Sequence, residues 1–241
     1  MRLTLPLLLA LLCACAGPAG TPAAPALLLG EQHDATEHQQ KHREVIEALA
    51  RRGELAAVVL EMAQQERSTA GLSDSAGEDE VRKALGWNSQ AWPWEAYGPA
   101  VMAAVRAGVP VWGSNLSREQ MRTAMQDAQL DAALPAAALQ RQQEAIRSGH
   151  CGMLPPAQIL PMARVQIARD RAMARQVAAA AVPGKTVVLL AGAGHVDPEL
   201  GVPQHLPPRF GARPMVLPPV ATGRDYCAEL RRQMQAPSPG G

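Results

Sequence analysis

Short, unbroken apolar segments alternate along this chain with longer segments of helical periodicity. The apolar segments lie at residues 26–29, 56–60, 109–112 and 186–190, and they are too short to be buried helices. A last strand is expected at residues 213–217. Strands that read as continuous apolar runs are typical of parallel sheets whose two faces are both covered. The sequence therefore predicts an α/β fold, with a mostly parallel sheet of about four to five strands and helices on both faces.

Helices are expected between these strands. The periodicity places them at residues 35–52, from 95 or 99 to 107, and 157–181. Thr36 or Asp34 is expected to cap the first helix, and Ser117 with Gln120 has the pattern of a capping box. Residues 116–183 as a whole are predicted to form a helical insert, or lid, beside the sheet.

Ionisable residues follow the strands directly. Glu31 and His33 come after the first strand, Glu61 after the second, and His195 after the fourth, while Ser114 and Asn115 follow the third. The carboxyl ends of parallel strands meet at one edge of a sheet, where ligands usually bind in α/β folds. We therefore expect these side chains to form one functional site.

Two chemistries are open for this site. Glu31, His33, Glu61 and His195 can bind a divalent metal as mixed imidazole and carboxylate ligands, with a position left for water. The same four residues can instead act as catalytic base and electrostatic orienter without a metal. The glycines at 192 and 194 are expected to leave room for close backbone approach around His195.

A second histidine pair lies on the first predicted helix. His38 and His42 are separated by four residues, a spacing that can hold a metal. Their neighbours are polar and no third ligand is adjacent, so a solvated polar face is favoured.

The N-terminus reads as an export signal. Arg2 precedes an apolar stretch that is too short to span a bilayer, and Leu12 to Cys15 has the form of a lipobox. We expect residues 1–14 to be a signal peptide and Cys15 to be diacylated, with palmitate among the attached lipids, and residues 15–26 to be a tether. The expected location is the outer membrane, facing the periplasm or the cell surface. An ordinary signal peptide is the alternative.

Composition limits the partners. The formal net charge is +1 and no basic stripe is visible, which argues against nucleic acid as a partner.

After export and acylation of Cys15, two thiols remain, Cys151 and Cys227. They can form one disulfide or stay as two buried free thiols, and the sequence leaves both open. The folded domain is expected to span residues 27–235, followed by a tail at 236–241.

Seven ordered motifs resemble the ChaN family of haem-binding uptake lipoproteins, which is related to the Tiki and erythromycin-esterase-like superfamily. They read LLLGEQHDATEHQQ, VVLEM, WPWEAYGPAV, VWGSNLSR, HCGMLP, QIARDRAMA and LLAGAGHVDPELGVP. The resemblance implies a periplasm-facing, iron-linked lipoprotein that binds haem, as a homodimer with haem at the subunit interface. It also implies an α/β core shared with metal-dependent hydrolases.

The resemblance assigns activity to two turns. They correspond here to Gly30, Glu31 and His33, and to Gly192 and His195. Many family members carry basic residues shortly after the second turn, whereas this chain has Asp197-Pro198-Glu199 at that point. If those basic groups meet haem propionates, the contact is weakened here.

Haem requires an apolar slot, an axial ligand and cations for its propionates. Only two tyrosines exist, Tyr97 and Tyr226, and Tyr97 lies in an aromatic segment with Trp92 and Trp94. Tyr97, Trp94 and His150 are the predicted haem contacts. A core patch sealed by Trp87, Trp92, Trp94 and Tyr97 is the alternative and is favoured for Tyr97, and Lys41 and Lys185 are candidate propionate partners.

The sequence thus predicts a membrane-anchored haem-binding lipoprotein that serves haem or iron uptake. The alternative is a metal-dependent hydrolase, of the esterase or peptidase kind, that uses the residues at the strand ends.

Overall fold

A computed structural model describes residues 24–235 of the chain. The predicted signal peptide, the expected lipidation site at Cys15, most of the predicted tether and the C-terminal tail lie outside the described residues. None of the helices within residues 24–235 combines the length and the apolar character needed to cross a bilayer.

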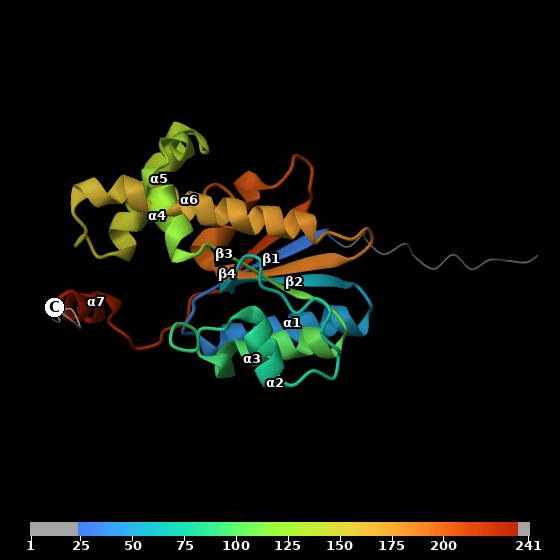
Figure 1. Cartoon of the computed structure of the whole chain (residues 1–241). Coiled ribbons are helices and arrows are strands. Elements are labelled where there is room, and N and C mark those ends of the chain that lie inside the picture. The colour runs from blue at the N-terminus through green and yellow to red at the C-terminus, as the bar shows by residue number, and fades with distance from the viewer. Residues whose placement is uncertain (1–23, 236–241) are drawn as a thin grey trace, which may run out of the picture.

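A five-stranded parallel sheet forms the centre of the molecule (Figure 1). The strands are β1 (Ala26–Glu31), β2 (Leu55–Gln64), β3 (Val111–Asn115), β4 (Thr186–Gly192) and β5 (Ala212–Val216). Their order is β3-β2-β4-β1-β5, and every pairing is parallel. The predicted α/β fold class is confirmed.

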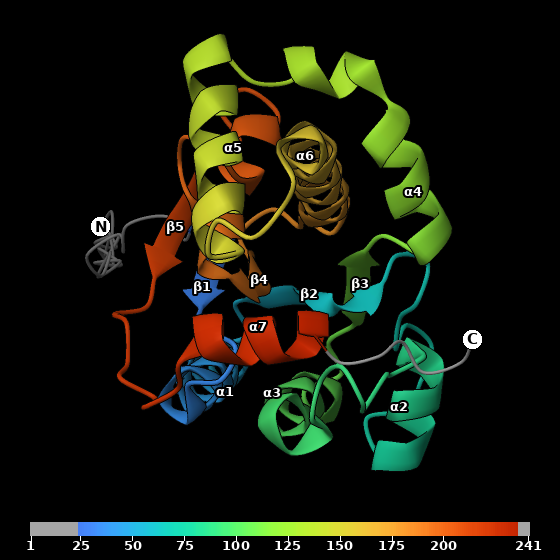
Figure 2. The same ribbon diagram turned by 90° about the vertical axis from the view of Figure 1, so that its left-hand side faces the viewer.

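Helices cover both faces of the sheet (Figures 1 and 2). One layer contains α1 (Thr36–Arg51), α2 (Glu78–Leu85) and α3 (Trp94–Arg106), and the other contains α4 (Arg118–Gln126), α5 (Ala136–Gly149) and α6 (Pro156–Ala179). Short 3-10 turns lie at Ala128–Ala132, Ala193–Val196 and Val202–His205. A last helix, α7 (Tyr226–Gln235), lies across the carboxyl ends of the strands between the two layers (Figure 2).

The strands separate two apolar cores because successive side chains point to opposite faces. Leu29 packs in one core with Ile46 of α1 and Val101 of α3, whereas its neighbour Leu28 packs in the other with Met173 of α6. Burial of each such side chain contributes about 1.5–3 kcal/mol. These cores hold the sheet rigid and fix the positions of the residues at its edge.

The helix starts differ from one another. At α4 the predicted capping box forms, with Ser117 accepting from the backbone of Gln120. At α1 the predicted cap is wrong: Ala35 occupies the N-cap and no side chain caps the helix. Asp34 is not free for that role, because its carboxylate accepts hydrogen bonds from Gln32 and Tyr226.

The favoured interpretation of His38 and His42 is also wrong, since both are buried. His38 links two segments: its Nδ1 accepts from the backbone N–H of Gln32 at 2.9 Å, and its Nε2 donates to the carbonyl of Pro218 at 2.9 Å. His42 lies beneath the strand ends. The polar pattern of this helix face reflects a buried polar network.

Candidate functional site at the carboxyl edge of the sheet

The sheet order explains why Glu31 and Glu61 lie close together. Strand β4 lies between β1 and β2, and its register pairs Glu31 with Gly192 and Leu60 with Leu190. The two carboxylates therefore flank the end of β4, and His195 follows on the next turn. The structure brings together all four residues predicted for this edge, Glu31, His33, Glu61 and His195.

Glu31 is the centre of a buried hydrogen-bond network. Its carboxylate accepts from the hydroxyl of Tyr97 at 2.6 Å, from Nδ1 of His33 at 2.7 Å and from the amide of Gln39 at 2.9 Å. His42 approaches the same carboxylate with Nδ1 at 3.5 Å. Since so many donors converge on it, Glu31 positions His33.

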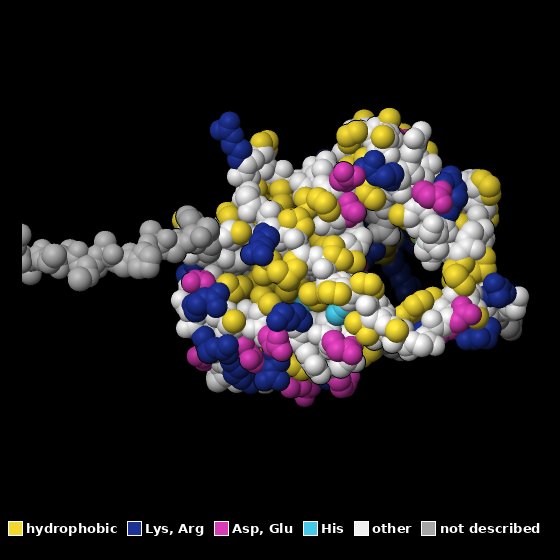
Figure 3. All heavy atoms as spheres, turned by 180° about the vertical axis from the view of Figure 1, so that it is seen from behind, with side chains coloured by type: hydrophobic (Ala, Val, Ile, Leu, Met, Phe, Trp, Pro, Cys, Tyr) yellow, Lys and Arg dark blue, Asp and Glu magenta, His cyan; other side chains and the backbone are white. Residues whose placement is uncertain are grey.

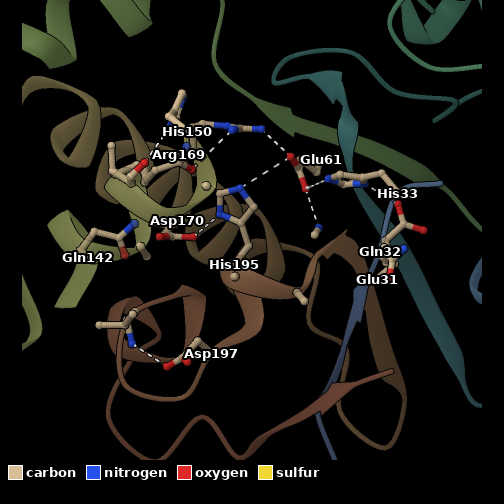
Figure 4. A pocket seen from close by; sticks show the side chains of 18 of the residues that line it. Glu31, Gln32, His33, Glu61, Gln142, His150, Arg169, Asp170, His195 and Asp197 are labelled. Carbon is tan, nitrogen blue, oxygen red and sulfur yellow. Dashed lines mark hydrogen bonds and ion pairs between the residues drawn. The ribbon is translucent and has the colours of Figure 1, made fainter. Parts of the chain in front are cut away.

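Glu61 connects three elements (Figure 4). Its Oε1 accepts from the Arg169 guanidinium at 2.5 Å, and its Oε2 accepts from the backbone N–H of Gly192 at 2.7 Å. Nε2 of His195 lies 3.6 Å from Oε1, and Nε2 of His33 lies 3.9 Å from Oε2. The Glu61 carboxylate is thus shared among one arginine and two imidazoles.

His195 pairs with an acid from α6. Its Nδ1 lies 2.6 Å from Oδ1 of Asp170, so the opposite nitrogen, Nε2, faces Glu61 (Figure 4). An imidazole held by a carboxylate at one nitrogen can exchange a proton at the other. The arrangement is therefore capable of acid–base chemistry without a metal.

The charges shift the pKa values of the site. Burial alone would raise the pKa of Glu61, but the charges of His195, Arg169 and His33 outweigh burial and lower it to about 2. Burial raises the pKa of Asp170 to about 6, against the opposing charge of His195. Burial would lower the pKa values of His33 and His195, yet the neighbouring carboxylates raise both. Groups with such opposed shifts cluster at functional sites.

Glycine 192 is required by close packing. A Cβ at this position would lie 2.8 Å from Nε2 of His33, closer than a real side chain allows. The close contact is with the imidazole of His33, and not around His195 as predicted. At Gly194 a Cβ would meet nothing within 4 Å, so close approach does not explain that glycine.

A cavity of about 730 Å³ opens in front of this edge, beside α5 and α6. Figure 3 shows the molecule hollowed there, with basic side chains visible inside. The strand ends form its floor, α5 and α6 form one wall, and the segment before α7 closes part of the mouth. Apolar lining comes from Ala145, Ile146 and Leu200, and positive charge comes from Arg169 and Arg224.

Two of the predicted haem contacts do not line the cavity. Tyr97 is 1% exposed and its hydroxyl is bound to Glu31, and burial together with the Glu31 charge raises its pKa. A phenolate ligand at Tyr97 is therefore disfavoured. Trp94 is buried in the layer of α1 to α3 and donates its indole N–H to Glu78. Both residues seal the core, as the alternative interpretation of the aromatic segment predicted.

The third predicted contact, His150, does line the cavity. Its Nδ1 donates to the carbonyl of Ile146 at 2.8 Å. This bond leaves Nε2 as the nitrogen available to a ligand. Tyr226, the other tyrosine, lines the cavity too and is 47% exposed. A disulfide joins Cys151 to Cys227, so the residues that follow His150 and Tyr226 are directly bonded.

The predicted divalent-metal site at Glu31, His33, Glu61 and His195 is not supported. Among residues 24–235, no three His, Cys, Asp or Glu side chains are arranged to hold a metal ion. The physical reason is that the carboxylate oxygens already have donors. Arg169 supplies a fixed positive charge where a metal was expected, and Tyr97, Gln39 and His33 saturate Glu31.

Sequence reasoning missed Arg169 and Asp170 as site residues. They are adjacent on α6, more than 100 positions from Glu61 in sequence. The signal available was the run of three adjacent charged residues, Arg169, Asp170 and Arg171, within the motif QIARDRAMA. Asn115, at the end of β3, accepts from Nε of Arg169 at 3.1 Å and orients it, whereas Ser114 is buried and donates to the carbonyl of Leu60.

Acidification should destabilise the protein through His42. Neither of its ring nitrogens has a hydrogen-bond partner, and burial lowers its pKa to about 4 from an unfolded value of 6.5. The contribution of neutral His42 to the free energy of unfolding is complete above pH 6.5 and is lost as the pH falls toward 4. Between these pH values only the unfolded chain binds the proton. Between pH 8 and pH 5 this amounts to about 2 kcal/mol.

Urea unfolding at several pH values measures this effect. The variant His42→Leu should lose about 2 kcal/mol less than the wild type over that range, whereas Lys41→Ala, exposed on the same helix, should behave as the wild type. Equal pH dependence in His42→Leu and the wild type would disprove the assignment.

Comparison with known proteins agrees with this architecture. A model of the family described as "Haem-binding uptake, Tiki superfamily, ChaN" matches residues 21–206. A solved structure described as "Cofacial heme binding to ChaN of Campylobacter jejuni" superposes with a TM-score of 0.63 at 23% identity, covering 76% of this chain and 75% of that chain. The likeness shows a shared fold.

A second solved structure, of the type III effector HopBA1, reaches a TM-score of 0.40 at 18% identity, over 72% of this chain and 70% of that chain. None of the curated proteins compared with the sequence matches it.

Proposed function

The chain belongs to the ChaN family of haem-binding uptake proteins in the Tiki superfamily, and we propose that it binds haem in the cavity at the carboxyl edge of the sheet. The observation that carries this proposal is the cavity itself. Its volume of about 730 Å³ lies in the range of pockets that enclose drug-sized and cofactor-sized ligands.

The lining fits the chemistry of haem. Apolar side chains from α5 and from the turn after β4 offer surface to the porphyrin, chiefly Ala145, Ile146 and Leu200. Arg169 and Arg224 supply positive charge for the propionates. When bound, the haem would supply a ferric iron to be coordinated, and the chain's own residues would provide its ligand and exclude water from it.

Two residues are suited to coordinate the iron. Nε2 of His150 is available because the other ring nitrogen is bound to the backbone. Tyr226 lines the same cavity, and a tyrosine oxygen is a suitable ligand for haem iron. His33 and His195 are less suited, because their Nε2 atoms face the Glu61 carboxylate at 3.9 and 3.6 Å.

We also propose that the protein is anchored at the outer membrane and serves haem or iron uptake there. The lipobox that ends at Cys15 supports the anchoring. In Cys15→Ser, the protein should move from the membrane fraction to the soluble fraction.

We also propose a homodimer in which haem is enclosed between the cavity openings of the two subunits, and light scattering with and without hemin tests this. A metal-dependent hydrolase is not proposed, because the carboxylate oxygens that would bind the metal already accept hydrogen bonds from neighbouring side chains.

Titration of the purified chain with hemin tests the haem proposal. We expect a saturable, shifted Soret band, and we expect its position to change in Tyr226→Phe or in His150→Ala, because the axial ligand sets the spectrum. A spectrum equal to that of free hemin at every ratio would refute the proposed function.

A further inference from the structure

Residues 217–235, here called the C-terminal strap, lie outside the part of the chain that the family model matches, which ends at residue 206. The strap follows β5 and includes α7, and it crosses the carboxyl ends of the strands between the two helical layers (Figure 2). Two of its residues, Arg224 and Tyr226, line the cavity. The strap is therefore a wall of the cavity that family membership does not explain.

Hydrogen bonds attach the strap to the loop after β1. His38 donates to the carbonyl of Pro218 at 2.9 Å, and the side chain of Gln32 bonds both the carbonyl and the N–H of Val220, at 3.1 and 3.2 Å. The hydroxyl of Tyr226 then donates to Asp34 at 2.8 Å. This side of the strap is held by the same loop that carries His33.

The attachment to the opposite layer is covalent. Cys227 of α7 is bonded to Cys151, which directly follows α5 and His150, with the two Cα atoms 5.7 Å apart. None of the residues of α7 is buried. A helix that buries no apolar face gains little from packing, so the disulfide is what keeps α7 against this layer.

The ion pairs of Arg224 are weak enough to let the strap move away from the cavity once the disulfide is broken. Its guanidinium pairs with Asp34 at 3.3 Å and with Glu229, and it lies 5.4 Å from the centre of the Tyr226 ring. The Arg224 side chain is about half-exposed and its two partners are partly exposed, so solvent screens both ion pairs and each contributes little to stability. Such contacts orient the two cavity-lining residues without holding the strap closed on their own.

We propose that the C-terminal strap is a thiol-controlled closure of the ligand cavity, which presents Arg224 and Tyr226 to the bound ligand only while Cys151 and Cys227 are bonded. With a dithiol as reductant, the sulfur–sulfur bond breaks and two cysteine thiols form, while the dithiol is oxidised to its own disulfide. Both cysteines are half-buried and within reach of a small dithiol. The inference rests on the proposed haem function for the identity of the ligand, but not for the motion.

The rate of hemin loss to an excess of apomyoglobin tests the closure. We expect the double variant Cys151→Ser/Cys227→Ser to release hemin on the order of tenfold faster than the oxidised wild type. Tyr226→Phe should also release it faster, and adding Tyr226→Phe to the double variant should change little more, because the open strap no longer presents Tyr226. Equal release rates with and without the disulfide would overturn the inference.

Hydrogen exchange separates this inference from the haem proposal and needs no ligand. In the folded wild-type chain, reduction followed by alkylation of the two thiols should speed amide exchange in residues 217–235 and leave β1 and β4 unchanged. If the strap responds in this way but hemin does not bind, only the haem proposal fails. If hemin binds but the strap exchanges equally fast in both states, only the closure fails.

Discussion

Replacing Glu61 by alanine should lower the free energy of unfolding by about 3–5 kcal/mol. The change leaves the largely shielded guanidinium of Arg169 without its carboxylate, leaves His195 with Asp170 as its remaining acid, and removes the acceptor of the Gly192 N–H. Breaking a buried ion pair costs far more than forming it contributes, because the remaining charge stays desolvated. Urea unfolding of the purified variant measures the loss.

A matched control is available on the surface. Glu44 pairs with Lys41 at 3.0 Å, but its side chain is 64% exposed, so Glu44→Ala should change stability by less than about 0.5 kcal/mol. The double variant Glu61→Ala/Arg169→Met should recover part of the loss, since it removes the charge left unpaired. Equal effects of Glu61→Ala and Glu44→Ala would show that the Glu61 network is not a buried ion pair.

Filling the cavity should weaken haem binding strongly with no loss of stability. Ala145 lies on the wall of the cavity formed by α5 and is exposed to it, so Ala145→Trp places an indole where the porphyrin is proposed to lie. We expect hemin affinity to fall on the order of a hundredfold, equivalent to about 3 kcal/mol. The measurement is the midpoint of a hemin titration followed at the Soret band.

The control for this variant lies on the same helix. Ala137 is also exposed on α5 but does not line the cavity, so Ala137→Trp should bind hemin as the wild type does. Unfolding midpoints of both variants should stay near the wild-type value, because neither site is in a core. Equal hemin affinity in Ala145→Trp and Ala137→Trp would place the haem outside this cavity.

The fold was predictable because it depends on local patterns. Apolar runs such as Thr186 to Leu190 have the length and flanks of buried parallel strands, and an all-parallel sheet places their carboxyl ends at one edge. The convergence of Glu31, Glu61 and His195 follows from that geometry alone. Strand limits were less accurate, and β2 runs past Glu61 to Gln64.

What the sequence could not supply was the packing of distant segments. The aromatic residues near Tyr97 are compatible with a haem contact as well as with the favoured core patch, and the contact with Glu31 decides for the core. The polar neighbours of His42 in the sequence suggested a solvated side chain, although it is buried with Nδ1 3.5 Å from the Glu31 carboxylate. The contacts of Arg169, the position of α7 and the Cys151–Cys227 bond all depend on tertiary distances that no local pattern encodes.

The most direct test of the haem site is a crystal of the chain grown with hemin and measured at the iron absorption edge. The account predicts an anomalous iron peak inside the cavity, beside Tyr226 or His150. An iron peak outside the cavity would contradict it.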